Sequence, residues 1–237
     1  MVKLFESNLY TTYYPQTLAE KLKDPASLTW IQRQTILIKV AEAIEALHSY
    51  GFIHRDIKAD NIMLDRTDNP LLTDLASLAN IVSELENSKH AHNGELNVCE
   101  DIRGTITNAA PEVIPDATGR QPYGAAADIW SFAVVCWFTF GGQETLFQAK
   151  WVPIEIRNRK ENICYYYHEG LDEVFPKHFS PWQQYCKLSE IGENVPPYIL
   201  RTCAASLNRD PKKRPTIGAI IQQLKNPHQE VIAIPKS

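Results

Sequence analysis

The alternation of apolar and polar residues predicts that the chain opens with short strands. Residues 1–14 contain two apolar runs separated by Glu6-Ser7-Asn8, a pattern typical of two strands joined by a turn. Pro15 has no amide hydrogen, so strand pairing is expected to end there. Residues 16–23 then favour a short helix.

The next element is the clearest helix of the sequence. Asp24-Pro25-Ala26 interrupts the chain, and Ser27 is a suitable N-cap for the helix that follows. Gly51 suits the left-handed turn at which a helix ends. Between these positions, apolar side chains recur at helical spacing, at Leu37, Val40, Ala41, Ile44 and Leu47.

A hairpin is predicted directly after this helix. Two apolar runs, residues 62–64 and 71–73, flank the turn sequence Asp68-Asn69-Pro70. The expected register pairs Ile62 with Thr73.

The rest of the chain is predicted to be helical apart from one loop. Residues 82–101 are polar and lack a period, which predicts a long loop. Residues 111–226 carry several helical segments, and the segment 129–140 is so apolar that it is expected to be buried on all sides. The sequence therefore predicts an α+β fold that is mainly α, with its strands near one end.

Composition narrows the classes of function. The 237 residues are 44% hydrophobic and carry a net charge of -4, with Lys212-Lys213-Arg214 as the one basic cluster, so nucleic acid is not expected as a partner. Five cysteines without a CxxC pair predict free thiols and a cytoplasmic location. The longest apolar run, 132–140, is shorter than the ~20 residues of a membrane span. A secretion signal would make the cytosol of a host cell the alternative location.

Four polar side chains would form one catalytic site. The hairpin register places Asn61 opposite Asp74, and a carboxamide and a carboxylate can share an Mg²⁺ ion at about 2.1 Å per ligand. Asp56 would accept a hydrogen bond from a substrate hydroxyl, and Lys58 would neutralise a transferring phosphoryl group. Singly, such residues usually cap turns or face solvent, but their joint spacing indicates phosphoryl transfer.

The segment Ile53-His54-Arg55-Asp56-Ile57-Lys58-Ala59-Asp60-Asn61 resembles the catalytic loop of protein kinases. Further segments follow in the order of that family and cover most of the chain: Asp74-Leu75-Ala76 after a strand, Gly104 to Pro111-Glu112, Asp128-Ile129-Trp130 in the apolar helix, and Leu207 to Arg214-Pro215-Thr216. The resemblance implies a kinase-like C-terminal lobe, ATP and Mg²⁺ as cofactors, and a protein as substrate or partner.

The resemblance also assigns roles to individual residues. Asp56 and Lys58 would be catalytic, and Asn61 and Asp74 would bind Mg²⁺. Tyr14 would contact the nucleotide from the hinge between the two lobes, and Met63 would contact it from the floor of the nucleotide site. Asp128 would hold the backbone of the catalytic loop, and Glu112 and Arg214 would form a buried ion pair. Lys58 and Thr105 resemble the residues of serine/threonine kinases rather than tyrosine kinases.

Arg55 resembles the arginine that receives a phosphate on the activation segment. Possible phosphate carriers are Ser83, Ser88, Thr105 and Thr107. The alternatives are that an acidic residue pairs with Arg55, namely Glu84, Glu86, Glu95 or Glu100, or that nothing does.

The resemblance is incomplete at the start of the chain. A phosphate-covering loop needs closely spaced glycines, and the first glycine is Gly51. Residues 1–15 resemble a residual pair of N-lobe strands and the hinge, and residues 16–237 resemble the C-lobe. Within that lobe, 74–112 would be the activation segment and 142–195 a divergent helical segment.

Several residues depart from the family pattern. Asp74-Leu75-Ala76 stands where the family has Asp-Phe-Gly, and Asn108 replaces an aromatic residue, so an altered substrate pocket is expected. His90, His92 and Cys99 do not have the spacing of a structural zinc site. The aromatic residues of the divergent segment, such as Trp151 and Trp182, are expected to pack within the lobe rather than to dock a partner.

Two main functions follow from these observations. The first is a serine/threonine protein kinase that transfers the γ-phosphate of ATP to a protein hydroxyl and needs a missing or separately supplied N-lobe, from a complementing chain or kinase partner. The alternative is a catalytically impaired binding module, a decoy, adaptor or inhibitor in a kinase pathway. A sensor that binds Mg²⁺ and nucleotide without transfer is a third possibility.

Overall fold

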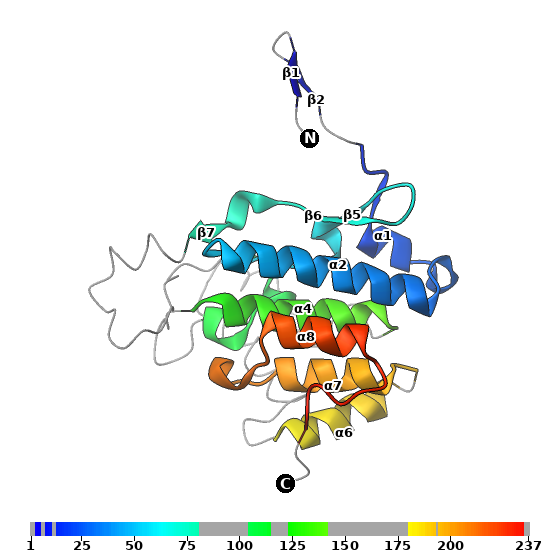
Figure 1. Cartoon of the computed structure of the whole chain (residues 1–237), viewed down its shortest axis with the longest axis vertical. Coiled ribbons are helices and arrows are strands. Elements are labelled where there is room, and N and C mark those ends of the chain that lie inside the picture. The colour runs from blue at the N-terminus through cyan, green and yellow to red at the C-terminus, as the bar shows by residue number, and fades with distance from the viewer. Residues whose placement is uncertain are drawn as a thin grey trace, which may run out of the picture.

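A computed structural model describes residues 3–5, 8–10, 13–80, 104–114, 123–141, 180–192 and 194–234. The chain forms a mainly helical body with a small sheet near its N-terminal end (Figure 1). This arrangement agrees with the predicted α+β class, because the described strands are short and all lie within the first 80 residues. The predicted loop at 82–101, with His90, His92 and Cys99, lies outside the described residues.

The first strands form as expected, but the chain pairs again after Pro15. Strands β1 (Lys3–Phe5) and β2 (Asn8–Tyr10) are antiparallel, with Phe5 opposite Asn8. Strand β3 (Gln16–Thr17) follows directly, so the prediction that strand pairing ends at Pro15 was wrong. Proline removes only its own amide donor, and the next two residues remain free to pair. The predicted helix is therefore shorter, as α1 (Leu18–Leu22).

Strands β3, β5 (Ile62–Leu64) and β6 (Pro70–Leu72) form one antiparallel sheet in that order. The hairpin is confirmed, but its predicted register was wrong by one residue, because Ile62 pairs with Leu72 rather than with Thr73. The turn between the strands sets this register. Asp65 accepts hydrogen bonds from the amides of Thr67 (2.7 Å) and Asn69 (2.9 Å) and donates its own amide to the Asn69 carbonyl.

The long helix α2 (Trp30–Ser49) begins two residues later than predicted. Its N-cap is Thr29, whose hydroxyl accepts from the Gln32 amide while the Gln32 side chain accepts from the Thr29 amide. Ser27 instead lies in a 3₁₀ turn (Pro25–Ser27) and donates its hydroxyl to the Lys21 carbonyl. Gly51, at φ 76°, ends the helix as predicted.

Four further helices lie in the described part of the chain: α4 (Ala125–Thr139), α6 (Pro181–Ile191), α7 (Pro197–Ser206) and α8 (Ile217–Lys225). Helix α4 contacts both α2 and α7, while α8 packs on α2 and α6 packs on α7 (Figure 1). The segment 129–140 is buried as predicted, with Trp130 and Phe132 fully enclosed. The predicted divergent segment covers residues 142–195, of which 142–179 lie outside the described part. The helix that the structure describes in this segment is α6.

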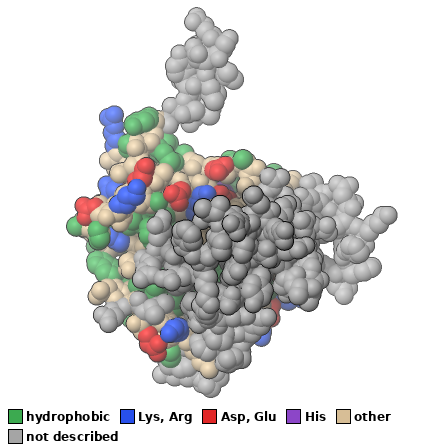
Figure 2. Space-filling model, turned by 180° about the vertical axis from the view of Figure 1, so that it is seen from behind, with side chains coloured by type: hydrophobic (Ala, Val, Ile, Leu, Met, Phe, Trp, Pro, Cys, Tyr) green, Lys and Arg blue, Asp and Glu red, His purple; other side chains and the backbone are tan. Residues whose placement is uncertain are grey.

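Short elements connect these helices and the sheet. They are the strands β4 (Phe52–Ile53) and β7 (Ala79–Asn80), which pair with each other, and the 3₁₀ turns Ala59–Asn61, Leu75–Ser77, Ile106–Asn108, Pro111–Val113 and Pro211–Lys213. Within the described ranges, Cys136, Cys186 and Cys203 are free thiols, and no helix has the length and apolarity needed to cross a membrane. Figure 2 shows basic and acidic side chains interspersed on the described part of one face, without a continuous basic area there.

Candidate active site

The loop 54–61 is attached to the buried helix α4 by one side chain. After β4 ends at Ile53, the amides of His54 and Arg55 donate to the two carboxylate oxygens of Asp128, at 2.8 and 2.9 Å. His48, near the end of α2, also lies 2.9 Å from Asp128. Asp128 is almost fully buried, so these partners satisfy a carboxylate that water does not reach. The fold thereby fixes the start of the loop.

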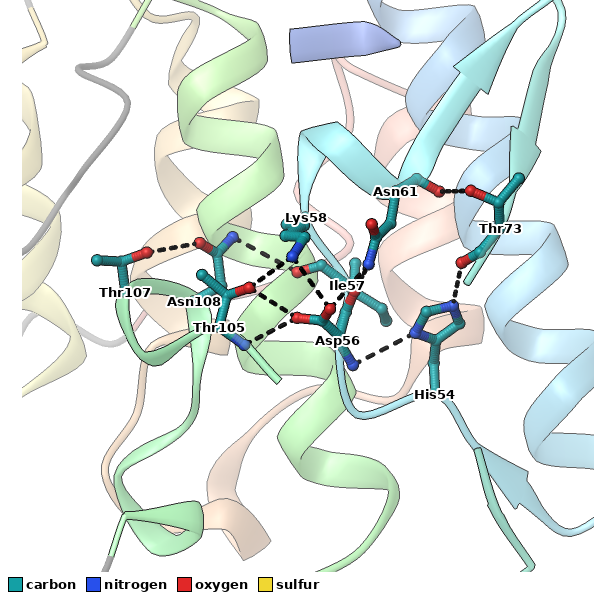
Figure 3. Close-up of polar contacts among 9 residues, drawn as sticks. All are labelled: His54, Asp56, Ile57, Lys58, Asn61, Thr73, Thr105, Thr107 and Asn108. Atoms are coloured by element: carbon teal, nitrogen blue, oxygen red, sulfur yellow. Dashed lines mark hydrogen bonds and ion pairs between the residues drawn. The ribbon is translucent and has the colours of Figure 1, made fainter. Parts of the chain in front are cut away.

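Asp56 lies at the centre of a dense hydrogen-bond network (Figure 3). Its Oδ1 accepts from both the amide (2.8 Å) and the hydroxyl (2.9 Å) of Thr105, a residue 49 positions away. Its Oδ2 accepts from Asn61 Nδ2 (2.9 Å) and lies 3.1 Å from Lys58 Nζ. Lys58 Nζ also donates to the Thr105 hydroxyl at 2.7 Å. The structure thus brings Asp56, Lys58 and Asn61 of the predicted site into contact, and it adds Thr105, which the sequence analysis placed in the substrate segment and not in this cluster.

These contacts decide the charge of Asp56. Burial acts to raise the pKa of the Asp56 carboxyl, but the hydrogen bonds from Thr105, Lys58 and Asn61, together with the positive charge of Lys58, outweigh it and hold the pKa below its usual value. Asp56 is therefore ionised at neutral pH. An ionised carboxylate can accept a hydrogen bond from a hydroxyl group, which a protonated one does poorly.

His54 joins this loop to the end of strand β6. One ring nitrogen, Nδ1, accepts from the Asp56 amide at 3.3 Å, and the other, Nε2, lies 2.9 Å from the Thr73 carbonyl (Figure 3). Since the amide can only donate and the carbonyl can only accept, the proton is assigned to Nε2. The sequence reasoning did not assign His54 a role. Both hydrogen-bond partners of its ring are backbone groups, which every residue has, so no residue type in the sequence marks the contact.

Asn61 is oriented so that its amide oxygen remains available. Its Nδ2 donates both to the carboxylate and to the carbonyl of Asp56, at 2.9 and 2.8 Å. Within the described ranges, Asn61 Oδ1 accepts no hydrogen bond, although the residue is only 7% exposed. The Asn61 carbonyl accepts from the amide and hydroxyl of Thr73, so Thr73, not Asp74, is the residue opposite Asn61. The predicted pairing of Asn61 with Asp74 was therefore wrong.

Asp74 follows Thr73 in a left-handed conformation, with φ 61° and ψ 63°. This turn directs the chain out of the sheet, and the Asp74 side chain is exposed. In the part of the chain that the structure describes, its carboxylate accepts no hydrogen bond. Mg²⁺ binds one or two protein carboxyl or amide oxygens and completes its shell with water and phosphates. The free Oδ1 of Asn61 and the carboxylate of Asp74 fit that requirement.

The proposed nucleotide contacts lie at the sheet. Met63 is on the middle strand, opposite Thr17 of β3 and Leu71 of β6. Opposed residues point to the same face of a sheet, so Met63 and Leu71 share one face, and Ile62 and Leu64 point to the other. Leu71 is 42% exposed. Tyr14, two residues before β3, is partly buried. Met63 and Leu71 therefore place apolar, partly accessible side chains on one face of this sheet.

Arg55 points toward the segment that follows Asp74. It has φ 69°, a left-handed conformation that is uncommon for a residue with a side chain. Its guanidinium donates to the carbonyls of Ser77 and Leu78. Of the predicted phosphate carriers, Thr105 and Thr107 are described, and Ser83 and Ser88 are outside the described residues, as are the four acidic alternatives.

The predicted ion pair between Glu112 and Arg214 is present. Two parallel hydrogen bonds of 2.6 and 2.7 Å join the guanidinium to the carboxylate. Arg214 also donates to the carbonyls of Ala126 and Asn208, and its guanidinium lies 5.1 Å from the centre of the Trp130 ring. This pair anchors the segment that carries Thr105 to the helical body.

Several known proteins are similar in sequence to this chain. A family model of the protein kinase domain matches residues 6–225. A probable serine/threonine-protein kinase of Dictyostelium discoideum is 27% identical over 199 residues, which are 84% of this chain and 26% of the relative. Serine/threonine-protein kinase 16 of Mus musculus is 27% identical over 211 residues, which are 87% of this chain and 59% of the relative. A dual serine/threonine and tyrosine protein kinase of Apis mellifera is 30% identical over 51% of this chain and 10% of the relative.

The chain thus spans less than two thirds of each of these relatives. The family match, by contrast, covers most of the chain and includes every residue of the Asp56 network described above. On that match, the chain belongs to the protein kinase domain family.

Proposed function

We propose that the chain is the substrate-binding and catalytic lobe of a serine/threonine protein kinase, which transfers the γ-phosphate of ATP to a protein hydroxyl. One observation carries this proposal: an ionised carboxylate, Asp56, held rigidly beside the ammonium group of Lys58. Phosphoryl transfer needs a group that orients the acceptor hydroxyl and positive charge near the transferred phosphate, and these two residues supply both.

Asp56 would orient the acceptor hydroxyl and receive its proton. A carboxylate offers about four acceptor sites, and the Thr105 amide, the Thr105 hydroxyl, Asn61 and Lys58 already use four. A substrate hydroxyl would therefore replace one of these donors. The Thr105 hydroxyl is the one that a substrate hydroxyl resembles chemically, since it donates to Asp56 and accepts from Lys58.

Asn61 and Asp74 would hold Mg²⁺, and Met63 and Tyr14 would contact the adenine. When bound, the metal supplies positive charge that neutralises the phosphate oxygens. The protein residues have separate tasks: Asn61 fixes Asp56 and presents Oδ1, while Lys58 faces the transferred group.

The phosphates also need a cover. No glycine precedes Gly51, so residues 1–50 contain no glycine-rich phosphate loop. We propose that a second lobe supplies this cover, either from the same polypeptide or from a partner protein. Residues 1–15 would then be the residual N-lobe strands and hinge and residues 16–237 the C-lobe, acting on ATP and protein substrates in the cytoplasm.

The test is transfer of labelled phosphate to a generic basic protein with Mg²⁺ and ATP. Wild type, D56N and the control variant D60N, which changes an exposed aspartate of the same loop, are compared alone and with a kinase N-lobe added in trans. We expect transfer by wild type and D60N, and a loss of more than about 100-fold for D56N. No transfer under any of these conditions would reject the proposal.

Exposed apolar residues in strand β6 and in the turn that follows it favour a second candidate, a binding module for another kinase. Leu71 and Leu75 are 42% and 53% exposed. Substituting Asp56 and Asp74 by alanine discriminates the two functions. Partner binding that survives both substitutions supports the module, and a cellular effect lost from a folded variant supports the kinase.

A further inference from the structure

The chain turns back after helix α8 and forms a tail, residues 226–234, on the helical body (Figure 1). A hydrogen bond of 3.0 Å from the Gln229 amide to the Asn226 carbonyl closes the turn, with Pro227 at its second position. The match to the protein kinase domain ends at residue 225. The tail therefore lies outside the part of the chain that the family match covers.

Burial alternates along the end of the tail. Ile232 and Ile234 are 6% and 8% exposed and belong to the hydrophobic core, whereas Val231 and Ala233 are exposed. Two aliphatic side chains thus point inward at a spacing of two residues. Surfaces that bind extended peptides take up alternate side chains in the same way.

One side chain of α8 holds the backbone of the tail. Gln223 is fully buried, and a carboxamide buried without hydrogen bonds is costly. Its Nε2 donates to the carbonyls of Asn226 and Gln229 at 3.4 and 2.8 Å, and its Oε1 accepts from the Ile232 amide at 3.0 Å. All three partners are main-chain groups, so Gln223 recognises the path of the backbone and not the type of side chain.

These contacts define a tail groove, which is the surface that receives Ile232 and Ile234 with Gln223 beside it. The two inward positions favour aliphatic side chains, because a charged side chain would lose its water against the hydrophobic core. The residue between them faces solvent and is free to vary. The groove therefore fits any segment with the pattern aliphatic, any residue, aliphatic.

The tail is held by few contacts beyond its turn. In the part of the chain that the structure describes, residues 230–234 make one hydrogen bond, from the Ile232 amide to Gln223. A tethered segment competes with a free peptide at an effective concentration in the millimolar range, by order of magnitude. The tail therefore excludes weak ligands from the groove but remains replaceable by a partner that is concentrated or that also binds elsewhere.

We propose that the tail groove is a docking site for partner proteins that present two aliphatic side chains two residues apart, and that residues 226–234 are its built-in competitor. This inference goes beyond the proposed function and does not depend on Asp56 or on phosphate transfer. Its tests contain no ATP.

The first experiment measures binding of a fluorescein-labelled peptide of residues 226–234 to the whole chain by fluorescence polarisation. The double substitution I232S and I234S in the whole chain releases the tail, and this released variant should bind the peptide at least about tenfold more tightly than wild type. V231S changes an exposed residue of the tail and should bind as wild type does. A peptide that carries serine in place of both isoleucines should not bind.

A second peptide tests whether the groove accepts partners other than the tail. It has an unrelated sequence of alanine and serine with two leucines two residues apart, and it should bind the released variant within about threefold of the tail peptide. Glutamate in place of both leucines should abolish binding. Q223M in the released variant should weaken binding about tenfold, because it removes the hydrogen bonds at similar size, whereas the exposed neighbour control Q222M should not.

Thermal unfolding shows whether the released variant is folded, and wild type decides if it is not. Hydrogen exchange of wild type is then followed by mass spectrometry with and without about 5 mM of the leucine peptide, a concentration chosen to compete with the tethered tail. Displacement of the tail should speed exchange in the segment that contains the Ile232 amide and leave α4 unchanged.

Four results would each overturn the inference. They are equal binding of the tail peptide by wild type and a folded released variant, failure of the leucine peptide to bind that variant, no effect of Q223M, and unchanged exchange in wild type at the highest peptide concentration. Peptide binding without phosphate transfer would count against the proposed kinase function alone, and transfer without peptide binding would count against the tail groove alone.

Discussion

Thr105 donates two hydrogen bonds to a single oxygen of Asp56, one from its amide and one from its hydroxyl. Only the hydroxyl bond can be removed by a side-chain change. T105A should lower the free energy of unfolding by about 1–2 kcal/mol, because a hydrogen bond to a charged group is lost and Lys58 loses one of its two partners and keeps only Asp56. T105S keeps the hydroxyl and should stay within about 0.5 kcal/mol of wild type in urea unfolding. Equal losses for both variants would show that the methyl group, not the hydroxyl, matters.

The ionisation of Asp56 predicts a pH dependence. Its pKa is lower in the folded protein than in an unfolded chain, so its ionised form stabilises the fold. This contribution is fully present above about pH 4 and is lost as the pH falls through the folded-state pKa. The excess stability of wild type over D56N should therefore shrink below about pH 4 in urea unfolding.

The matched control for this pH series is D60N, which changes an exposed residue of the same loop. Hydrogen bonds from Asn69 and Thr67 lower the pKa of Asp65 to about 2. Asp65 is present in wild type, D56N and D60N alike, so its contribution to the pH dependence of unfolding cancels when the variants are compared. If the difference in unfolding free energy between wild type and D56N grows as the pH falls, the pKa of Asp56 is not lowered by folding.

The Glu112–Arg214 pair should be much more important than a surface pair. The Arg214 side chain is fully buried, so E112Q leaves its charge uncompensated and should cost about 3–5 kcal/mol of unfolding free energy. Glu42 and Lys225 form an exposed pair at 2.7 Å, and E42Q should cost less than about 1 kcal/mol. Chemical denaturation of both variants measures the difference. Similar small losses would mean that Ala126 and Asn208 suffice to hold Arg214.

Gly104 is the glycine on which the position of Thr105 depends. Its φ is +89°, and a Cβ there would lie 2.2 Å from the Arg55 carbonyl oxygen. G104A should therefore destabilise the protein by at least about 2 kcal/mol and reduce phosphate transfer, because the segment must move away from Asp56.

A second glycine provides the comparison. In G218A, inside α8, the new Cβ approaches only the flexible Glu45 carboxylate, and helix propensity favours alanine by about 0.5–1 kcal/mol. G218A should be as stable as wild type or slightly more stable in thermal unfolding. A loss of the same size in both variants would rule out the Arg55 clash as the cause.

Side-chain pairs were the most predictable part of the molecule. The Asp56–Lys58 contact and the Glu112–Arg214 pair follow from an ordered set of motifs in which both partners are side chains of recognisable type. The contacts of Asp128 with the amides of His54 and Arg55 follow only from the family resemblance, which implies that Asp128 holds this backbone. The hairpin register did not follow, because hydrogen bonds from a turn centred on Asp65 fix it. The run 62–64 is apolar at every position, so it has no alternation of apolar and polar residues that would specify a register.

The remaining differences have local causes. Strand β3 has two residues and exists only because β5 lies beside it, so no periodicity could predict it. The N-cap of α2 could have been predicted: Thr29 has Gln32 three residues on and forms a capping box, whereas Ser27 has Trp30 at that position.

Helix α4 supports three parts of the proposed site at once. Asp128 holds the loop 54–61, Ser131 holds the Asn108 carbonyl, and Val134 and Val135 line a pocket of about 150 Å³ that Lys58 and Thr105 also line. These residues all lie within the eight-residue stretch 128–135 of α4. Substitutions that change the packing of α4 are therefore expected to shift the loop 54–61 and the Asn108 backbone as well, so the stability of the core and the geometry of the proposed site cannot be varied independently.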